Sequence, residues 1–146
     1  MTQSERNVIL HSFLAETAEG LSRMEKSLQE LEMHPEDSES IQVVFRVIHN
    51  VKGNAGILEL KKLNLFAQTL ENLLDEIRGE NPRVDAELIS QLLASVAVLR
   101  EMTAAAGEGR DEISQFGKSV LARISKSVSA AHSAAWDPGR SPARYS

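Results

Sequence analysis

Apolar residues recur every three or four positions along most of this chain, a spacing that places them on one face of an α-helix. The first such stripe predicts a helix over about residues 5–33, which ends at His34-Pro35 because proline cannot continue a helix. The residues expected to face inward from this helix are Phe13, Leu14, Leu21, Met24, Leu28 and Leu31.

An acidic turn over residues 35–38 supplies cap residues for a second helix. The apolar face of that helix consists of Ile41, Val44, Ile48, Val51, Ala55 and Leu58. A third helix is expected over about residues 61–78, with Gly79 as its left-handed terminator and Asn81-Pro82 as the turn that follows. Its inward residues are Leu63, Phe66, Leu70, Leu73, Leu74 and Ile77.

Two more helices are expected after Asp85, which is the predicted cap of the fourth. The fourth helix packs through Leu88, Leu92, Val96 and Leu99 and fades into residues 104–107. A fifth, weaker helix is expected over about residues 111–130, facing inward with Ile113, Phe116, Val120 and Ile124. Five helical stripes with few aromatic or β-branched runs predict an all-α bundle.

Helical periodicity stops at His132, where proline, glycine, arginine and serine take over. We therefore expect a folded domain over residues 1–131. Residues 132–146 are expected to form a disordered tail or to be a remnant of an expression vector.

Composition narrows the possible functions. The chain has 146 residues and a net charge of −5 with both signs interspersed, which gives no electrostatic footprint for nucleic acid or anionic lipid. Cysteine is absent, which rules out disulfides, thiolate nucleophiles and cysteine-type zinc sites. No unbroken apolar run approaches a membrane span, and the N-terminus lacks the pattern of a secretory signal. The expected location is the cytoplasm, with neither nucleic acid nor membrane as a partner.

Residues 49–56 (HNVKGNAG) interrupt the second helix with weak helix formers. On a regular helix, Lys52 and Gly53 flank His49 one turn on, and Gly56 lies almost directly along the axis from it. Each glycine costs a helix about 1 kcal/mol relative to alanine, so a compensating gain is expected. Close approach of another protein or of a phosphoryl group to His49 would supply that gain, and Lys52 would offset the charge of a phosphate.

The pattern His49-x-x-Lys52-Gly53-x-Ala55-Gly56 resembles the signature of histidine-containing phosphotransfer domains. It is most similar to the N-terminal domain of CheA-type chemotaxis histidine kinases, and the likeness extends to Phe45-Arg46-Val47-Ile48 and to the segment 70–78. The resemblance implies an up-and-down four-helix bundle with a fifth C-terminal helix. It also implies that Glu71 accepts a hydrogen bond from Nδ1 of His49 and leaves Nε2 facing solvent for attack on phosphorus.

Two positions depart from the family pattern. Glu59 stands where the family usually has a glycine at the end of the second helix, so either that turn is made without glycine or the second helix runs on. Gln68 occupies a place where many relatives carry a second histidine, and an amide cannot titrate.

The resemblance implies a phosphoryl relay. A histidine kinase catalytic domain would place the γ-phosphoryl of ATP on His49, and an aspartate of a response-regulator receiver domain would remove it. Gly53, Gly56 and Gln68 are expected to lie where these partners dock. No nucleotide-binding loop is visible, so we expect no cofactor in this chain, with ATP and Mg²⁺ supplied through the partner domains. The chain is either free-standing or a piece of a larger kinase.

Three alternatives remain open. A metal-binding bundle is disfavoured because His11, His34, His49 and His132 show none of the spacings typical of helical ligand pairs. A helical adaptor whose His49 is never phosphorylated is the main alternative. A hydrolase with His49 as general base lacks a serine or cysteine nucleophile placed beside it.

Overall fold

The computed structural model describes the backbone of residues 1–77 and 84–135 and the side chains of that range up to residue 129. It contains five helices and, within these residues, no strand: α1 (Gln3–Met33), α2 (Ser38–Ile57), α3 (Lys61–Ile77), α4 (Ala86–Gly107) and α5 (Gln115–Ala135). The all-α prediction is therefore confirmed.

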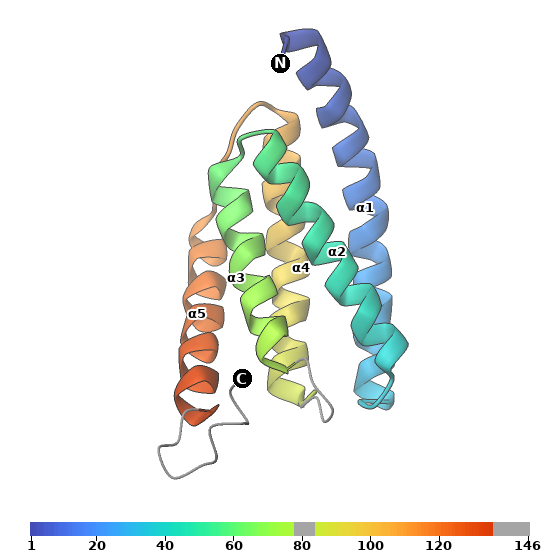
Figure 1. The fold of residues 1–146 in the computed structure, drawn as a ribbon, viewed down its shortest axis with the longest axis vertical. Coiled ribbons are helices and arrows are strands. Elements are labelled where there is room, and N and C mark those ends of the chain that lie inside the picture. The colour runs from blue at the N-terminus through green and yellow to red at the C-terminus, as the bar shows by residue number, and fades with distance from the viewer. Residues whose placement is uncertain (78–83, 136–146) are drawn as a thin grey trace.

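The helices run alternately up and down and pack side by side around one core (Figure 1). α2 packs between α1 and α3, α4 packs against α1, and α5 closes the bundle by packing against both α3 and α4. α4 is long and apolar enough to cross a membrane by length and composition, but most of its apolar window is buried among the other helices. A helix enclosed in a bundle has the same composition.

The apolar stripes predicted for the first four helices are confirmed, since nearly all of these side chains are buried in a single cluster. Leu14 and Ile77 are the half-buried exceptions. Asp85 caps α4 as expected, because its Oδ1 accepts a hydrogen bond from the Leu88 amide at 2.8 Å. Gly79 and Asn81-Pro82 lie outside the described residues.

The prediction for the fifth helix was wrong at its start. α5 begins at Gln115, and Ser114 caps it by accepting a hydrogen bond from the Gly117 amide at 3.0 Å. Val120 and Ile124 are buried as expected, but Phe116 is 50% exposed. α5 continues to Ala135, and the expected domain boundary after residue 131 stays a prediction.

Asp111 does not start α5 because its carboxylate caps a different helix. Oδ2 and Oδ1 accept hydrogen bonds from the amides of Lys62 and Leu63 at 2.8 and 3.2 Å, at the first turn of α3. The residue before that helix is Leu60, which has no side-chain acceptor of its own. A carboxylate 49 positions away in the sequence thus accepts the hydrogen bonds of backbone amides that α3 itself leaves unpaired at its start.

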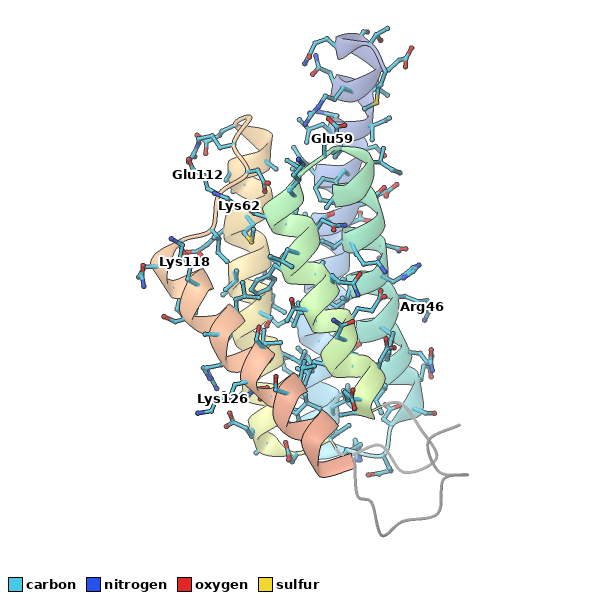
Figure 2. All side chains as sticks on the ribbon, turned by 60° about the vertical axis from the view of Figure 1, so that its left-hand side comes forward. Arg46, Glu59, Lys62, Glu112, Lys118 and Lys126 are labelled. Carbon is cyan, nitrogen blue, oxygen red and sulfur yellow. The ribbon has the colours of Figure 1, made fainter. Side chains whose placement is uncertain are left out.

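Helices α2 and α4 end with the same hydrogen-bonded motif. After α2, the amides of Glu59 and Leu60 donate to the carbonyls of Gly56 and Ala55; after α4, those of Gly109 and Arg110 donate to the carbonyls of Ala106 and Ala105. The motif requires a left-handed residue directly after the cap. That residue is Gly109 in one case, with φ of 83°, and Glu59 in the other, with φ of 59° (Figure 2).

α2 does not run on, and the turn to α3 keeps the geometry that favours glycine although a glutamate occupies it. Arg6 helps to hold this turn, because its guanidinium donates to the Leu58 carbonyl at 2.7 Å.

Candidate functional site

His49 projects from the middle of α2, and its side chain is 67% exposed. Its Nδ1 lies 3.0 Å from Oε2 of Glu71 on α3. An ionised carboxylate can only accept a hydrogen bond, so Nδ1 carries the proton and, in the neutral ring, Nε2 holds the lone pair. Within the part of the chain that the structure describes, the ring makes no other hydrogen bond, and Nε2 is open to an incoming group.

Glu71 is largely enclosed between α2 and α3, with 14% of its side chain exposed, and each of its oxygens has a partner. The Lys52 ammonium donates to Oε1 at 2.7 Å, and His49 occupies Oε2. The hydrogen bond from Lys52 is the largest influence on the pKa of Glu71, which it lowers; partial burial opposes this, and the hydrogen bond from His49 adds to the lowering. The carboxylate is therefore ionised at neutral pH.

Lys52 is half-buried, because its ammonium turns back onto Glu71. The expectation that Lys52 neutralises a phosphate is not tested by this geometry and stays a prediction. Two turns before Glu71 on α3, Asn64 donates from its side-chain amide to the Lys52 carbonyl at 2.9 Å, which ties α3 to α2 beside the site.

The two glycines after His49 have different surroundings. A Cβ built at Gly53 would meet nothing within 4 Å, whereas one at Gly56 would contact the Asn64 amide nitrogen at 3.4 Å. Internal packing therefore does not require glycine at 53. Gln68 lies on α3, one turn before Glu71, and is half-buried. Its side-chain amide donates a hydrogen bond to the Asn72 side chain at 2.9 Å.

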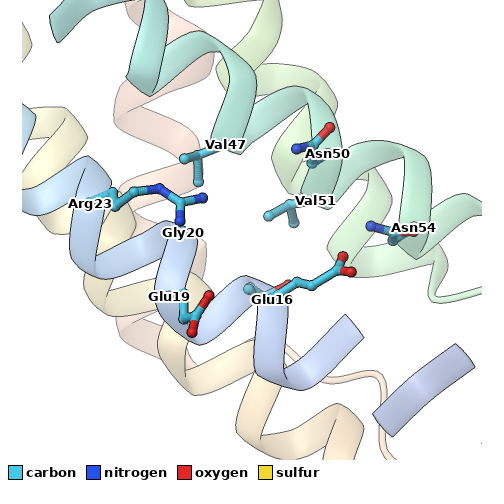
Figure 3. Close-up of a pocket in the computed structure, with 9 residues that line it drawn as sticks. Glu16, Glu19, Gly20, Arg23, Val47, Asn50, Val51 and Asn54 are labelled. Carbon is cyan, nitrogen blue, oxygen red and sulfur yellow. The ribbon is translucent and has the colours of Figure 1, made fainter. Parts of the chain in front are cut away.

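An open groove of about 450 Å³ borders the imidazole between the first half of α2 and the second half of α3. Phe45, Arg46 and Asn50 line it on the α2 side, and Glu71 and Asp75 line it on the α3 side. A smaller groove of about 160 Å³ lies on the other side of α2, between α2 and α1. Arg23 and two glutamates line it on the α1 side (Figure 3). Asn50 belongs to both grooves, but only the first contains the imidazole.

Sequence reasoning singled out His49, Lys52 and Glu71, and the structure brings these three side chains into direct contact. Sequence reasoning did not identify Asn64, and it did not place Arg46 in the groove. The available signals for Arg46 were its place in the Phe45-Arg46-Val47-Ile48 likeness and its spacing of three residues before His49, which puts both on one helix face. No group of three or more His, Cys, Asp or Glu side chains that could hold a metal ion occurs among residues 1–77 and 84–129.

Comparisons with known proteins identify relatives of this chain. The model of the Hpt domain family matches residues 8–108. The chemotaxis protein CheA of Rhizobium meliloti (strain 1021) is 33% identical over 105 residues, which is 72% of this chain and 14% of that protein. CheA of Treponema pallidum (strain Nichols) is 31% identical over 94 residues, which is 64% of this chain and 12% of that protein. The chain thus spans only a small part of these curated relatives.

A solved structure shares the fold. It is the phosphorylated P1 domain of CheA3 in complex with CheY6 from R. sphaeroides, which matches with a TM-score of 0.77 and 23% identity. The match covers 84% of this chain and 97% of the other. Since the family model covers well over half of the sequence and the fold agrees with it, this chain belongs to the Hpt domain family.

Proposed function

We propose that this chain is a phosphoryl relay in two-component signalling, with His49 as the group that carries the phosphoryl. The observation that carries the proposal is an exposed imidazole whose Nδ1–H is held by an ionised carboxylate. That arrangement fixes the tautomer and the ring orientation that a nucleophilic Nε2 needs.

The chemistry requires few groups from this chain. The Nε2 lone pair attacks the γ-phosphorus of ATP, the P–N bond forms, and the P–O bond to ADP breaks with its electron pair leaving on ADP. The ring then carries positive charge with Nδ1 still protonated, and the Glu71 carboxylate at 3.0 Å stabilises that charge. Lys52 holds Glu71 in place through its other oxygen.

The partners follow from this chemistry. A histidine kinase catalytic domain supplies ATP and Mg²⁺, and a response-regulator receiver domain supplies the aspartate that later takes the phosphoryl. The names of the relatives, which are chemotaxis CheA proteins, and the CheY6 complex of the fold relative support these partner classes. The relay would work in the cytoplasm. Gly53, where a side chain would project into open space, lies one turn from His49 and would leave room for a docking partner.

The test is incubation with γ-labelled ATP and the catalytic part of a CheA-type kinase. The wild-type chain should take up an acid-labile, base-stable label, and His49→Gln should take up none while keeping its helical content, because His49 lies outside the core. A wild-type chain that stays unlabelled would favour the adaptor alternative instead.

A further inference from the structure

The cation that neutralises a phosphoryl group on His49 has to come from a residue beside the imidazole, and α2 offers two. Lys52 lies three residues after His49 and Arg46 three residues before it, so both flank His49 on one face of the helix. Their surroundings differ.

Lys52 is already engaged. Its ammonium donates to Glu71 Oε1 at 2.7 Å, and only 23% of its side chain is exposed. To reach a phosphoryl group on the exposed side of the ring, it would have to leave the carboxylate that holds His49 in place. The energy of a contact with phosphate would then be offset by the loss of a short, partly buried ion pair.

Arg46 is available. It is exposed on the outer side of α2 (Figure 2), and no ion pair or hydrogen bond of its side chain occurs among residues 1–77 and 84–129. Arg100, Arg110 and Arg123 each pair with a glutamate. Arg23 on α1 also has no such partner among these residues, but it lines the other groove, so Arg46 is the unpaired arginine that shares a groove with His49.

The groove places Arg46 and His49 around one open volume of about 450 Å³. Its α3 side presents two carboxylates, Glu71 and Asp75, which can only accept hydrogen bonds and therefore offer no donor to a phosphoryl group. Its α2 side presents the guanidinium of Arg46 and the amide of Asn50, both of which donate hydrogen bonds. A phosphoryl group on the ring is therefore favoured against the α2 side.

We propose that Arg46 is the residue of this chain that binds the phosphoryl group once it is attached to His49, while Lys52 positions Glu71. The proposal rests on the phosphorylation of His49 put forward above. A guanidinium suits the task because its fork of donors matches two phosphate oxygens.

The test uses phosphorylated protein from which the kinase and ATP have been removed, so that a role in docking cannot contribute. The rate of spontaneous loss of the phosphoryl group is measured at neutral pH. Arg46→Gln should lose it about three-fold faster, the size expected for a solvent-exposed ion pair, and Arg46→Lys should restore part of the difference. Arg123→Gln removes the same charge from α5 and should match the wild type.

A second readout reports the contact itself. The Arg46 Nε–H signal in ¹H–¹⁵N NMR should shift when the wild type is phosphorylated. Lys52→Gln should keep this shift, because Lys52 acts on Glu71. Equal rates of loss for wild type and Arg46→Gln, or an unmoved Arg46 signal, would overturn the inference while leaving the relay intact. A wild-type chain that never takes up label would instead refute the relay and the inference together.

Discussion

The α2–α3 pair and the α4–α5 pair are built from similar parts that serve different purposes. Each pair contains a helix that ends in the same hydrogen-bonded motif, and each contains a glycine inside a helix. In α4–α5 both features suit the fold: Gly109 takes the left-handed position, and Gly117 fits where a Cβ would meet Ile113 at 2.6 Å and Val98 at 3.2 Å. In α2–α3 neither does, since Glu59 holds the left-handed position and Gly53 faces open space.

This difference separates stability from function. Gly117 is required by packing, because a side chain there would clash with its neighbours. Gly53 weakens α2, although the packing around it has room for a side chain. Gly53 lies one turn beyond an exposed, oriented imidazole. The gain that compensates for this glycine is therefore expected from a group that approaches the imidazole.

Replacing Glu71 with alanine should slow phosphorylation of His49 roughly 10- to 100-fold, the range seen when a group that orients a reactive histidine is lost. Helical content should change little, because Glu71 lies at the edge of the core. Glu87→Ala, which removes the glutamate partner of Arg123 in the α4–α5 pair, is the matched control and should leave the rate unchanged. Equal rates for Glu71→Ala and wild type would show that Glu71 does not prepare the imidazole.

The same substitution at two glycines should have opposite effects. Gly117→Ala should lower the free energy of unfolding by about 2 kcal/mol, because its Cβ would overlap Ile113. Gly53→Ala should raise it by up to about 1 kcal/mol and should slow phosphorylation by the kinase. Denaturant unfolding and label uptake measure the two quantities. A Gly53→Ala variant that is more stable and equally reactive would remove the functional reason for this glycine.

Exchanging the residues at the two helix ends should move stability in opposite directions. Glu59→Gly should raise the free energy of unfolding by about 1 kcal/mol, the cost of a left-handed conformation for a residue with a Cβ. Gly109→Glu should lower it by a similar amount. If Glu59→Gly destabilised the protein, a contact of the Glu59 side chain would have to outweigh the backbone strain.

The smallest effect concerns pH. Because Lys52 and His49 lower the pKa of Glu71 in the folded state, its contribution to stability is complete above the ordinary glutamate pKa of about 4.3. That contribution is lost as pH falls through the lowered value. The stability gap between wild type and Glu71→Gln should therefore be constant near neutrality and close only at acidic pH. A gap that closed above pH 5 would mean that the Glu71 pKa is not lowered.

Much of the fold follows from local sequence. Four helices and their inward faces were predicted from periodicity, because each stripe is long and bounded by a proline or a capping aspartate. The start of α5 was missed because Asp111 is a good local cap that the fold uses for α3, across 49 residues. Phe116 was also misplaced, because it has the helical spacing of the buried Val120 and Ile124 but is 50% exposed in the first turn of α5.

The site was predictable to a similar degree. His49, Lys52 and Glu71 followed from a motif and a resemblance. The structure shows the expected hydrogen bond between His49 and Glu71 and, in addition, one from Lys52 to Glu71 that was not predicted. The engagement of Lys52 with Glu71, which leaves Arg46 as the available cation, depends on how α2 and α3 face each other. One helix considered alone does not contain that information.

The central claim is that Glu71 holds the proton on Nδ1 and that Nε2 takes the phosphoryl group. ¹⁵N NMR of the His49 ring before and after phosphorylation tests it most directly. We predict a protonated Nδ1 and a bare Nε2 in the free protein, and coupling of ³¹P to Nε2 in the phosphorylated one. A proton on Nε2 in the free protein, or coupling of ³¹P to Nδ1, would contradict the account.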